Sequence, residues 1–518
     1  MSADEEKKPG AVRARPLSSA GLPDFMKDTT RSTITPSEDN EEAQGPLKMI
    51  NSLWSSFQRK LSKNSECPSG GRDKLEVSPP ITPSVPKVLA RKPTSHSCSS
   101  SGHFFEYLVV VSLQKKGDGT YGPKITYQFP KREGMVKFQM EEEQKTLKAI
   151  TLFCFPEGVK WAPLTEYRSE TFSFVLTEID GSRKNGYCRR LLPQGKGARS
   201  PEAYCIISQL ACFGLFSKIF DEVEKRRQIS MAMIYPFMQS LREAQFPAPG
   251  ETVRIKSFIP ESGTETIVLT RPLDSWLEHV DFRTLFRCLQ DEHAVQVFAA
   301  AVLERRIIFV AEELSTLSQV IHAVVALLYP FSWQHTFISI VPEILIDVVM
   351  APTPYLLGVQ KHLLDFVTDQ SDLLIVDLCE GAANPFITSI GDERDILPPK
   401  LQEDIFEALS TKNHNSTAEE FNKIVSDAFL SFFVKTVGHF AGFIRRKRDG
   451  HPGVFDKQGF CKAVESKNTR KFVEKFIKTQ MFDVFIQEAE QQSHTQEGFF
   501  QKKIAENLEK KKLIPRKL

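Results

Sequence analysis

The chain has 518 residues, which allows two to four domains, and its 67 Lys and Arg residues nearly balance its 65 Asp and Glu residues. This balance argues against a nucleic-acid-binding protein, because such proteins usually carry a strong basic excess. The first residues lack the apolar core of a signal peptide, and no apolar run reaches the roughly 18 residues of a membrane span. We therefore expect a cytoplasmic protein whose nine cysteines stay reduced.

Residues 1–101 are rich in Ser, Pro, Lys and Glu and show little apolar periodicity, which predicts disorder. A short amphipathic island near residues 46–63 interrupts this composition, with Leu53, Trp54 and Phe57 on one helical face beside basic residues. Two interpretations of the island stay open. It is a helix that docks on a membrane surface or a partner, or it packs back on the protein or stays frayed, because short isolated helices are marginal in water.

Residues 102–250 are expected to form an upstream lobe. Six segments have the composition of strands, and turns that contain Gly or Pro separate several of them. The expected strands are residues 104–113, 124–129, 149–155, 171–178, 187–192 and 203–208, followed by a helix over 212–226. Consecutive strands followed by a helix are typical of an antiparallel α+β lobe.

Residues 251–405 are expected to form a central lobe around a parallel sheet. Residues 307–311 are a short apolar run bounded by charges, which predicts a buried strand. A helix pattern follows over residues 317–328, with Thr316 and Gln319 as its capping box. Further strands are predicted at residues 336–341 and 373–378. The alternation of strands and helices predicts an α/β lobe with a mostly parallel sheet covered on both faces.

Residues 406–492 are expected to be helical, because apolar residues such as Phe429, Phe432 and Phe433 recur at helical spacing. Such stripes are typical of a packed core. Residues 493–518 form a basic tail, interpreted as a solvated end or as a segment with weak affinity for acidic membranes.

The sequence contains no phosphate-binding loop, dinucleotide-binding glycine motif, nucleophile elbow or paired zinc histidines. We therefore expect no cofactor, no metal and no covalent catalysis, while a hydrolase with an unrecognised site stays open. The cluster Glu304-Arg305-Arg306 is interpreted either as an ion-pair group at a site or as the cap of a helix before the buried strand.

Short blocks spread over residues 102–492 have the residues, and the order, of one known family. They read FCFPEG at 153–158, FSFVLT at 172–177, GYCRRL at 186–191, LYPFSW at 328–333, APTP at 351–354 and FFVK at 432–435. In these blocks the chain resembles the DENN domain family, and within it the type 2 subfamily. Residues 1–101 carry none of the resemblance.

The resemblance implies a bilobal, tripartite module: a longin-like antiparallel amino-terminal lobe, a doubly wound α/β central lobe and a helical carboxy-terminal extension. It also implies a guanine nucleotide exchange factor for a Rab GTPase, Rab nine for the type 2 subfamily, in endosomal membrane trafficking. The expected location is then the cytoplasm, with peripheral contact to endosomal or Golgi vesicles. The alternative is a Rab-binding scaffold or effector without exchange activity.

Ligands of open α/β sheets gather beyond the carboxyl ends of the strands, and this rule selects candidate Rab contacts. Glu312, Glu313 and Ser315 follow the first central strand and are the first candidates. Trp333 and His335 are a second pair, interpreted either as exposed recognition residues or, for Trp333, as packing at the edge of the sheet.

Overall fold

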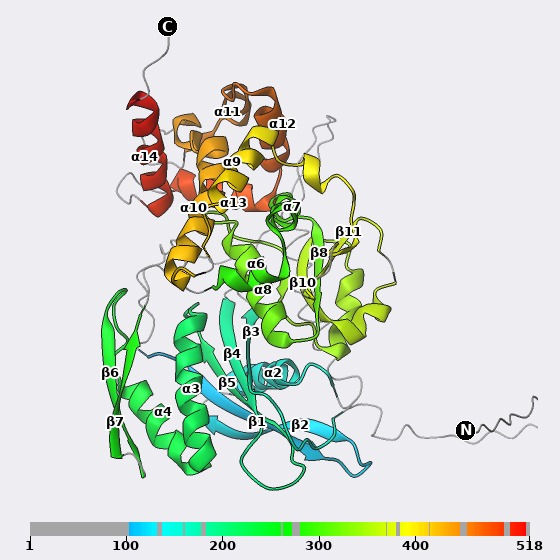
Figure 1. Cartoon of the computed structure of the whole chain (residues 1–518), viewed down its shortest axis with the longest axis vertical. Helices are drawn as coiled ribbons and strands as arrows, with labels where there is room; N and C mark the ends of the chain where they lie inside the picture. The colour runs from blue at the N-terminus through cyan, green and yellow to red at the C-terminus, as the bar shows by residue number, and fades with distance from the viewer. Residues whose placement is uncertain are drawn as a thin grey trace, which may run out of the picture. The chain divides into compact units, whose positions relative to one another are not determined.

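The structure is a computed structural model (Figure 1). It describes residues 103–131, 137–158, 161–177, 183–260, 263–271, 280–368, 370–379, 384–413, 415–445, 453–491 and 498–513. The predictions for residues 1–101, including the amphipathic island near 46–63, lie outside the described residues.

The upstream lobe is built on a five-stranded sheet in which every neighbouring pair is antiparallel, as the sequence predicted. Its strand order is β2-β1-β5-β4-β3. The strands are β1 (Tyr107–Lys115), β2 (Tyr121–Phe129), β3 (Glu170–Thr177), β4 (Arg183–Leu191) and β5 (Glu202–Ser208). The strand predicted at 149–155 is wrong, because α2 (Lys137–Cys154) occupies most of that segment. Leu147, Ile150 and Cys154 recur at helical spacing there and pack into the core.

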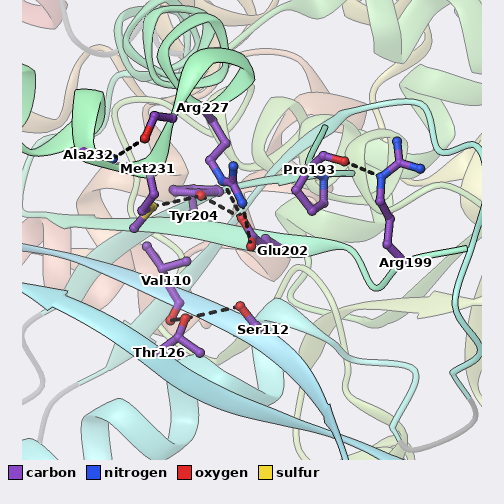
Figure 2. A network of polar contacts seen from close by, with 11 residues as sticks. Val110, Ser112, Thr126, Pro193, Arg199, Glu202, Tyr204, Arg227, Met231 and Ala232 are labelled. Carbon is purple, nitrogen blue, oxygen red and sulfur yellow. Dashed lines mark hydrogen bonds and ion pairs between the residues drawn. The ribbon is translucent and has the colours of Figure 1, made fainter. Parts of the chain in front are cut away.

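The opposite face of this sheet is covered by α3 (Phe213–Ile229), the short η1 (Met231–Met233) and α4 (Ile234–Glu243). Figure 2 shows how α3 is fastened to β5: Arg227 donates two hydrogen bonds to Glu202, at 2.8 and 3.0 Å. Glu202 also accepts a 2.8 Å hydrogen bond from the Tyr204 hydroxyl. Burial and the Glu202 carboxylate both raise the pKa of Tyr204, so its hydroxyl stays a donor.

A hairpin of β6 (Thr252–Ile259) and β7 (Gly263–Thr270) follows the FPAPG segment at residues 246–250. Its side chains Ile255, Ile267 and Leu269 are buried in the same apolar cluster as α3 and α4. The hairpin therefore packs with the upstream lobe, although it follows the boundary expected at residue 250.

The central lobe contains a second five-stranded sheet, in the order β12-β11-β8-β10-β9. The strands are β8 (Arg306–Ala311), β9 (Thr336–Ile338), β10 (Tyr355–Gln360), β11 (Leu373–Asp377) and β12 (Phe386–Thr388). All pairings are parallel except β11 with β12, which confirms the mostly parallel sheet. β10 was not predicted from the sequence, because a Pro-rich segment precedes it and Gly358 interrupts its apolar run. Gly358 is required there, since a Cβ would lie 2.0 Å from the Ser339 carbonyl oxygen.

The helices of this lobe are α6 (Phe282–Cys288) and α7 (Asp291–Val302) before β8, and α8 (Leu314–Ala326) after it. The predicted capping box of Thr316 and Gln319 is wrong, because α8 begins earlier. The side chain of its N-cap residue, Glu313, makes no capping hydrogen bond. Gln319 instead accepts a hydrogen bond from Thr284 of α6, at 2.7 Å. Short 3-10 helices complete the lobe: η2 (Glu343–Met350), η3 (Lys361–Phe366) and η4 (Glu393–Asp395).

The downstream part is helical, as predicted. It comprises α9 (Pro399–Leu409), α10 (Ala418–Val437), η5 (Phe440–Phe443), a small β13 (Ile444–Arg445) and β14 (Val454–Phe455) pair, α11 (Lys457–Lys462), α12 (Lys467–Phe476), α13 (Gln480–Gln491) and α14 (Phe499–Leu513). By length and composition alone, residues 418–443 would suffice to cross a membrane, but 61% of the 18-residue apolar window within them is buried inside the fold. The residues expected as a solvated tail include α14, whose Phe500 is buried against Phe440 and Phe485.

Candidate functional site

A buried arginine organises the junction between the two lobes. The guanidinium of Arg190, on β4, is only 3% exposed and donates to both carboxylate oxygens of Glu157, at 2.9 and 2.7 Å. Its charge also faces the rings of Phe155, Trp161, Tyr167 and Phe172, with centroids 5.2 to 6.0 Å away. Burial opposes the charged form, but Glu157 outweighs it and raises the pKa of Arg190 above its ordinary value. Arg190 is therefore a fixed cation inside an aromatic enclosure.

Glu170, on β3, carries this network across to the central lobe. One of its carboxylate oxygens lies 3.7 Å from Arg190, and the other accepts a 2.9 Å hydrogen bond from the backbone N–H of Ser315. Ser315 lies in the first turn of α8, where backbone N–H groups have no partner within the helix. A carboxylate at this position satisfies one of these groups and interacts favourably with the helix dipole. Glu170 thus caps α8 from the other lobe.

Further hydrogen bonds between the lobes use backbone carbonyl groups. Arg183 donates to the carbonyl of Trp333 at 3.0 Å, and the Ser339 hydroxyl donates to the carbonyl of Ser173 at 2.8 Å. The N–H of Glu343 donates to the carbonyl of Pro156 at 2.8 Å. These bonds reach three separate segments of the central lobe, so they fix its sheet against the upstream lobe.

Charged side chains gather where the parallel strands end. Glu312 and Glu313 follow β8 and are exposed, and Lys361 and His362 follow β10. Lys361 Nζ donates to the Cys379 sulfur at 3.3 Å and lies 3.6 Å from Asp377 Oδ2, at the end of β11. The hydrogen bond with Cys379 and the carboxylates of Asp377 and Glu312 raise the pKa of Lys361.

Glu312, Lys361 and His362 line an open pocket at this edge of the sheet. The structure therefore places Glu312 beside a cation that the sequence did not indicate, and Glu313 is exposed next to Glu312 in the chain. Ser315, the third of the first candidates, is only partly exposed and lies in α8, where its backbone N–H is bound by Glu170. Lys361 was not among the predicted contacts, because the strand that it follows, β10, was not predicted.

Two short helices that contact each other, η2 and η3, expose apolar side chains, and η3 begins with the pocket residues Lys361 and His362. η2 has the sequence EILIDVVM, yet Val349 is its buried residue while Ile344 and Met350 are 41% and 46% exposed. Phe366, at the end of η3, is 53% exposed. Large contiguous patches of exposed apolar surface on a monomeric protein often mark binding sites. We call Ile344, Met350, Phe366 and the pocket residues together the carboxyl-edge face.

Trp333 and His335 are both buried, and for Trp333 this favours the packing interpretation. They are only 1% and 9% exposed, so the interpretation as exposed recognition residues is wrong. The Trp333 indole N–H donates to the carbonyl of Thr336 at 3.1 Å, which fits the packing interpretation. His335 Nε2 lies 3.0 Å from Glu304 Oε2.

Glu304 acts as a helix cap, but for a distant helix. Its carboxylate accepts hydrogen bonds from the backbone N–H groups of Gln480 and Met481, at 2.9 and 2.8 Å, where α13 begins. Arg305 forms an ion pair with Asp392 at 2.5 Å. The cluster Glu304-Arg305-Arg306 therefore holds the central lobe to neighbouring segments and is no reactive site. Within the described ranges, no group of three or more His, Cys, Asp or Glu residues could hold a metal ion.

Three family models match the chain in sequence order. They are the uDENN domain over residues 123–191, the DENN (AEX-3) domain over 199–381 and the dDENN domain over 455–503. The first falls in the upstream lobe, the second runs from β5 through the central sheet, and the third covers the last helices.

The chain is also similar to curated proteins over most of its length. It is 62% identical over 424 residues to DENN domain-containing protein 2D of Mus musculus, covering 80% of this chain and 90% of that protein. Its identity to the Homo sapiens protein of that name is 62% over 414 residues, covering 79% and 87%. Identity to DENN domain-containing protein 2B of Homo sapiens is 46% over 86% of this chain, which spans only 40% of that longer protein. All three family models match in sequence order, and the identity extends over 90% of the Mus musculus 2D protein. The chain therefore belongs to the DENN domain family.

Proposed function

We propose that this protein is a guanine nucleotide exchange factor that promotes GDP release from a Rab GTPase, with Rab nine as the first candidate. The observation that carries the proposal is the carboxyl-edge face: Ile344, Met350 and Phe366 are exposed on the contacting helices η2 and η3, and η3 also carries the charged pocket residues. An exchange factor needs a complementary surface, because the nucleotide and its magnesium belong to the GTPase. In this proposal the upstream lobe is longin-like, the central lobe is doubly wound, and the protein works at endosomal or Golgi vesicles.

The exchange mechanism rests on differential binding. A surface that binds the nucleotide-free GTPase more tightly than the GDP-bound form shifts the population toward the empty form, and so accelerates release. The apolar part of the face supplies association energy, and Glu312, Glu313 and Lys361 supply orientation and a faster encounter. A rigid face serves this purpose better than a mobile one, because less conformational freedom is lost on binding. The polar contacts from the upstream lobe, through Glu170 above all, supply that rigidity.

A scaffold or effector without exchange activity would use the same face. It differs in one measurable respect, because it would bind GDP-loaded and nucleotide-free Rab with equal affinity and would not shift the population. Binding to both forms therefore separates the two functions.

The test is the release of a fluorescent GDP analogue from a panel of Rab GTPases, Rab nine included, with the full chain added. We expect accelerated release from one Rab, and at least a tenfold slower release with the double variant Ile344→Ser/Phe366→Ser, as for interface anchors. Val454→Ser is the matched control, since Val454 is 56% exposed and lies on β14, outside the carboxyl-edge face. If the chain binds Rab GTPases but accelerates GDP release from none of them, the scaffold function would replace the exchange-factor function.

A further inference from the structure

The β6–β7 hairpin presents two chemically different faces. Its inner face buries Ile255, Ile267 and Leu269 against the helices of the upstream lobe. Figure 1 shows the hairpin alongside α3 and α4. Because side chains alternate along a strand, the remaining residues point away from this packing.

The outer face is a ladder of four cross-strand pairs. These pairs are Thr252 with Thr270, Arg254 with Val268, Lys256 with Thr266, and Phe258 with Thr264, and all eight residues are exposed. Phe258 is 61% exposed and Val268 54%. The outer face thus combines two cations, two large apolar side chains and four threonines.

Acidic side chains are absent from this outer face. The two strands contain a single carboxylate, Glu265, which is only partly exposed and is bound by Lys225 of α3 at 2.7 Å. The charges of Arg254 and Lys256 therefore have no carboxylate opposite them on the ladder, where Val268 and Thr266 are their partners. Such a face attracts an anionic surface.

Protection of the sheet edge explains only half of this composition. Cations on a two-stranded hairpin discourage pairing with other strands, which accounts for Arg254 and Lys256. It does not account for Phe258, because an exposed aromatic ring on the same face favours association. Cations beside an aromatic ring are typical of segments that lie in a membrane interface, with the ring among the headgroups and the cations at lipid phosphates.

We propose that the outer face of the β6–β7 hairpin binds an anionic membrane surface, with Arg254 and Lys256 at the lipid phosphates and Phe258 inserted between headgroups. The site lies on different elements from the carboxyl-edge face and does not depend on exchange activity. It would hold the upstream lobe at the surface of a vesicle.

The experiment is co-sedimentation of the full chain with vesicles of phosphatidylcholine alone or with one third phosphatidylserine. The wild type is expected to bind the anionic vesicles and to be released as salt rises, because screening shortens the range of the attraction. Arg254→Gln/Lys256→Gln is expected to lower the partition coefficient roughly 30-fold, at the usual contribution of a cation near an anionic surface. Phe258→Ser is expected to lower it several-fold at every salt concentration.

The matched control is Lys462→Gln/Lys471→Gln, which removes two exposed lysines from α11 and α12. An equal loss in this control would overturn the proposal, because binding would then follow total charge. Unchanged binding in both hairpin variants would also overturn it and transfer the membrane contact to another segment. If Phe258→Ser instead converts a dimer into a monomer in size-exclusion chromatography, the face is an interface between copies of the chain. Unaltered circular dichroism and melting temperature establish that the variants fold.

Discussion

Both junctions of the central lobe contain a carboxylate that caps a distant helix, but they differ in their aromatic packing. Toward the downstream helices, Phe331 packs against Phe433, Phe476 and Phe485, with ring centroids 4.8 to 4.9 Å apart. Toward the upstream lobe, the apolar core is continuous but is crossed by directed polar contacts, such as Glu170 with Ser315.

This difference indicates how one fold can combine a stable core with a surface of fixed orientation. The hydrophobic burial of aromatic rings is non-directional and gains its energy from buried area, so it tolerates small changes in geometry. A hydrogen bond to a helix end gains little net energy but specifies position. We infer that the downstream junction supplies stability, whereas the upstream junction sets the orientation of the carboxyl-edge face.

The largest effect is expected from breaking the aromatic junction. Phe331→Ala should lower the free energy of unfolding by about 3–5 kcal/mol, since the side chain is 1% exposed and a cavity would remain. Denaturant titration followed by tryptophan fluorescence measures this change. Phe366→Ala is the control, because its 53% exposed ring should cost much less. A similar cost for both would mean that the phenylalanine cluster is not the stabilising junction.

A smaller effect on stability, with a larger effect on exchange, is expected at the polar junction. Glu170→Ala removes the cap of α8 and should cost about 1 kcal/mol, while GDP release slows because the face is no longer fixed. Thr417→Ala is matched to it, because Thr417 caps α10 through the backbone N–H of Glu420. The control should lose comparable stability at unchanged exchange. Equal exchange rates in the two variants would show that Glu170 does not orient the carboxyl-edge face.

The charged rim of the carboxyl-edge face should affect binding kinetics more than stability. Glu312→Lys/Glu313→Lys is expected to slow GDP release about tenfold at low salt, with a smaller difference at high salt, because rim charges act on encounter. The melting temperature should be unchanged, since both side chains are exposed. Loss of folding in this variant would instead show that the two carboxylates are structural.

The smallest effect is expected from the ion pair of Arg305 and Asp392, and this effect is lost in acid. The hydrogen bond from Arg305 lowers the pKa of Asp392, so the pair stabilises the fold above the ordinary pKa of an aspartate. This contribution is lost as pH falls through the lowered pKa. Asp392 is 49% exposed, so Asp392→Asn should cost less than about 1 kcal/mol at pH 7. The difference from wild type should vanish near pH 2, as measured by denaturant titration, and a constant difference would exclude this ion pair as its source.

The sequence by itself determined the elements whose signal is local. The buried strand at 307–311, the helix after it and the apolar stripes of the downstream helices were predicted correctly, because each pattern lies within one short segment. The family blocks, too, are short local strings, and they identified the three-part organisation. Glu312 and Glu313 emerged as exposed candidates, since they directly follow a predictable strand.

Tertiary structure alone decided the features that depend on distant partners. Glu170 caps α8 across 145 positions, and Arg183 reaches the carbonyl of Trp333 across 150, so neither contact leaves a pattern in the chain. Burial of Trp333 and exposure of Phe366 follow from which segments cover them, because both residues are equally apolar in the sequence. The physical reason is that the hydrophobic effect is non-directional. The sequence therefore indicates which residues are apolar enough to be buried, whereas tertiary packing decides which of them are covered.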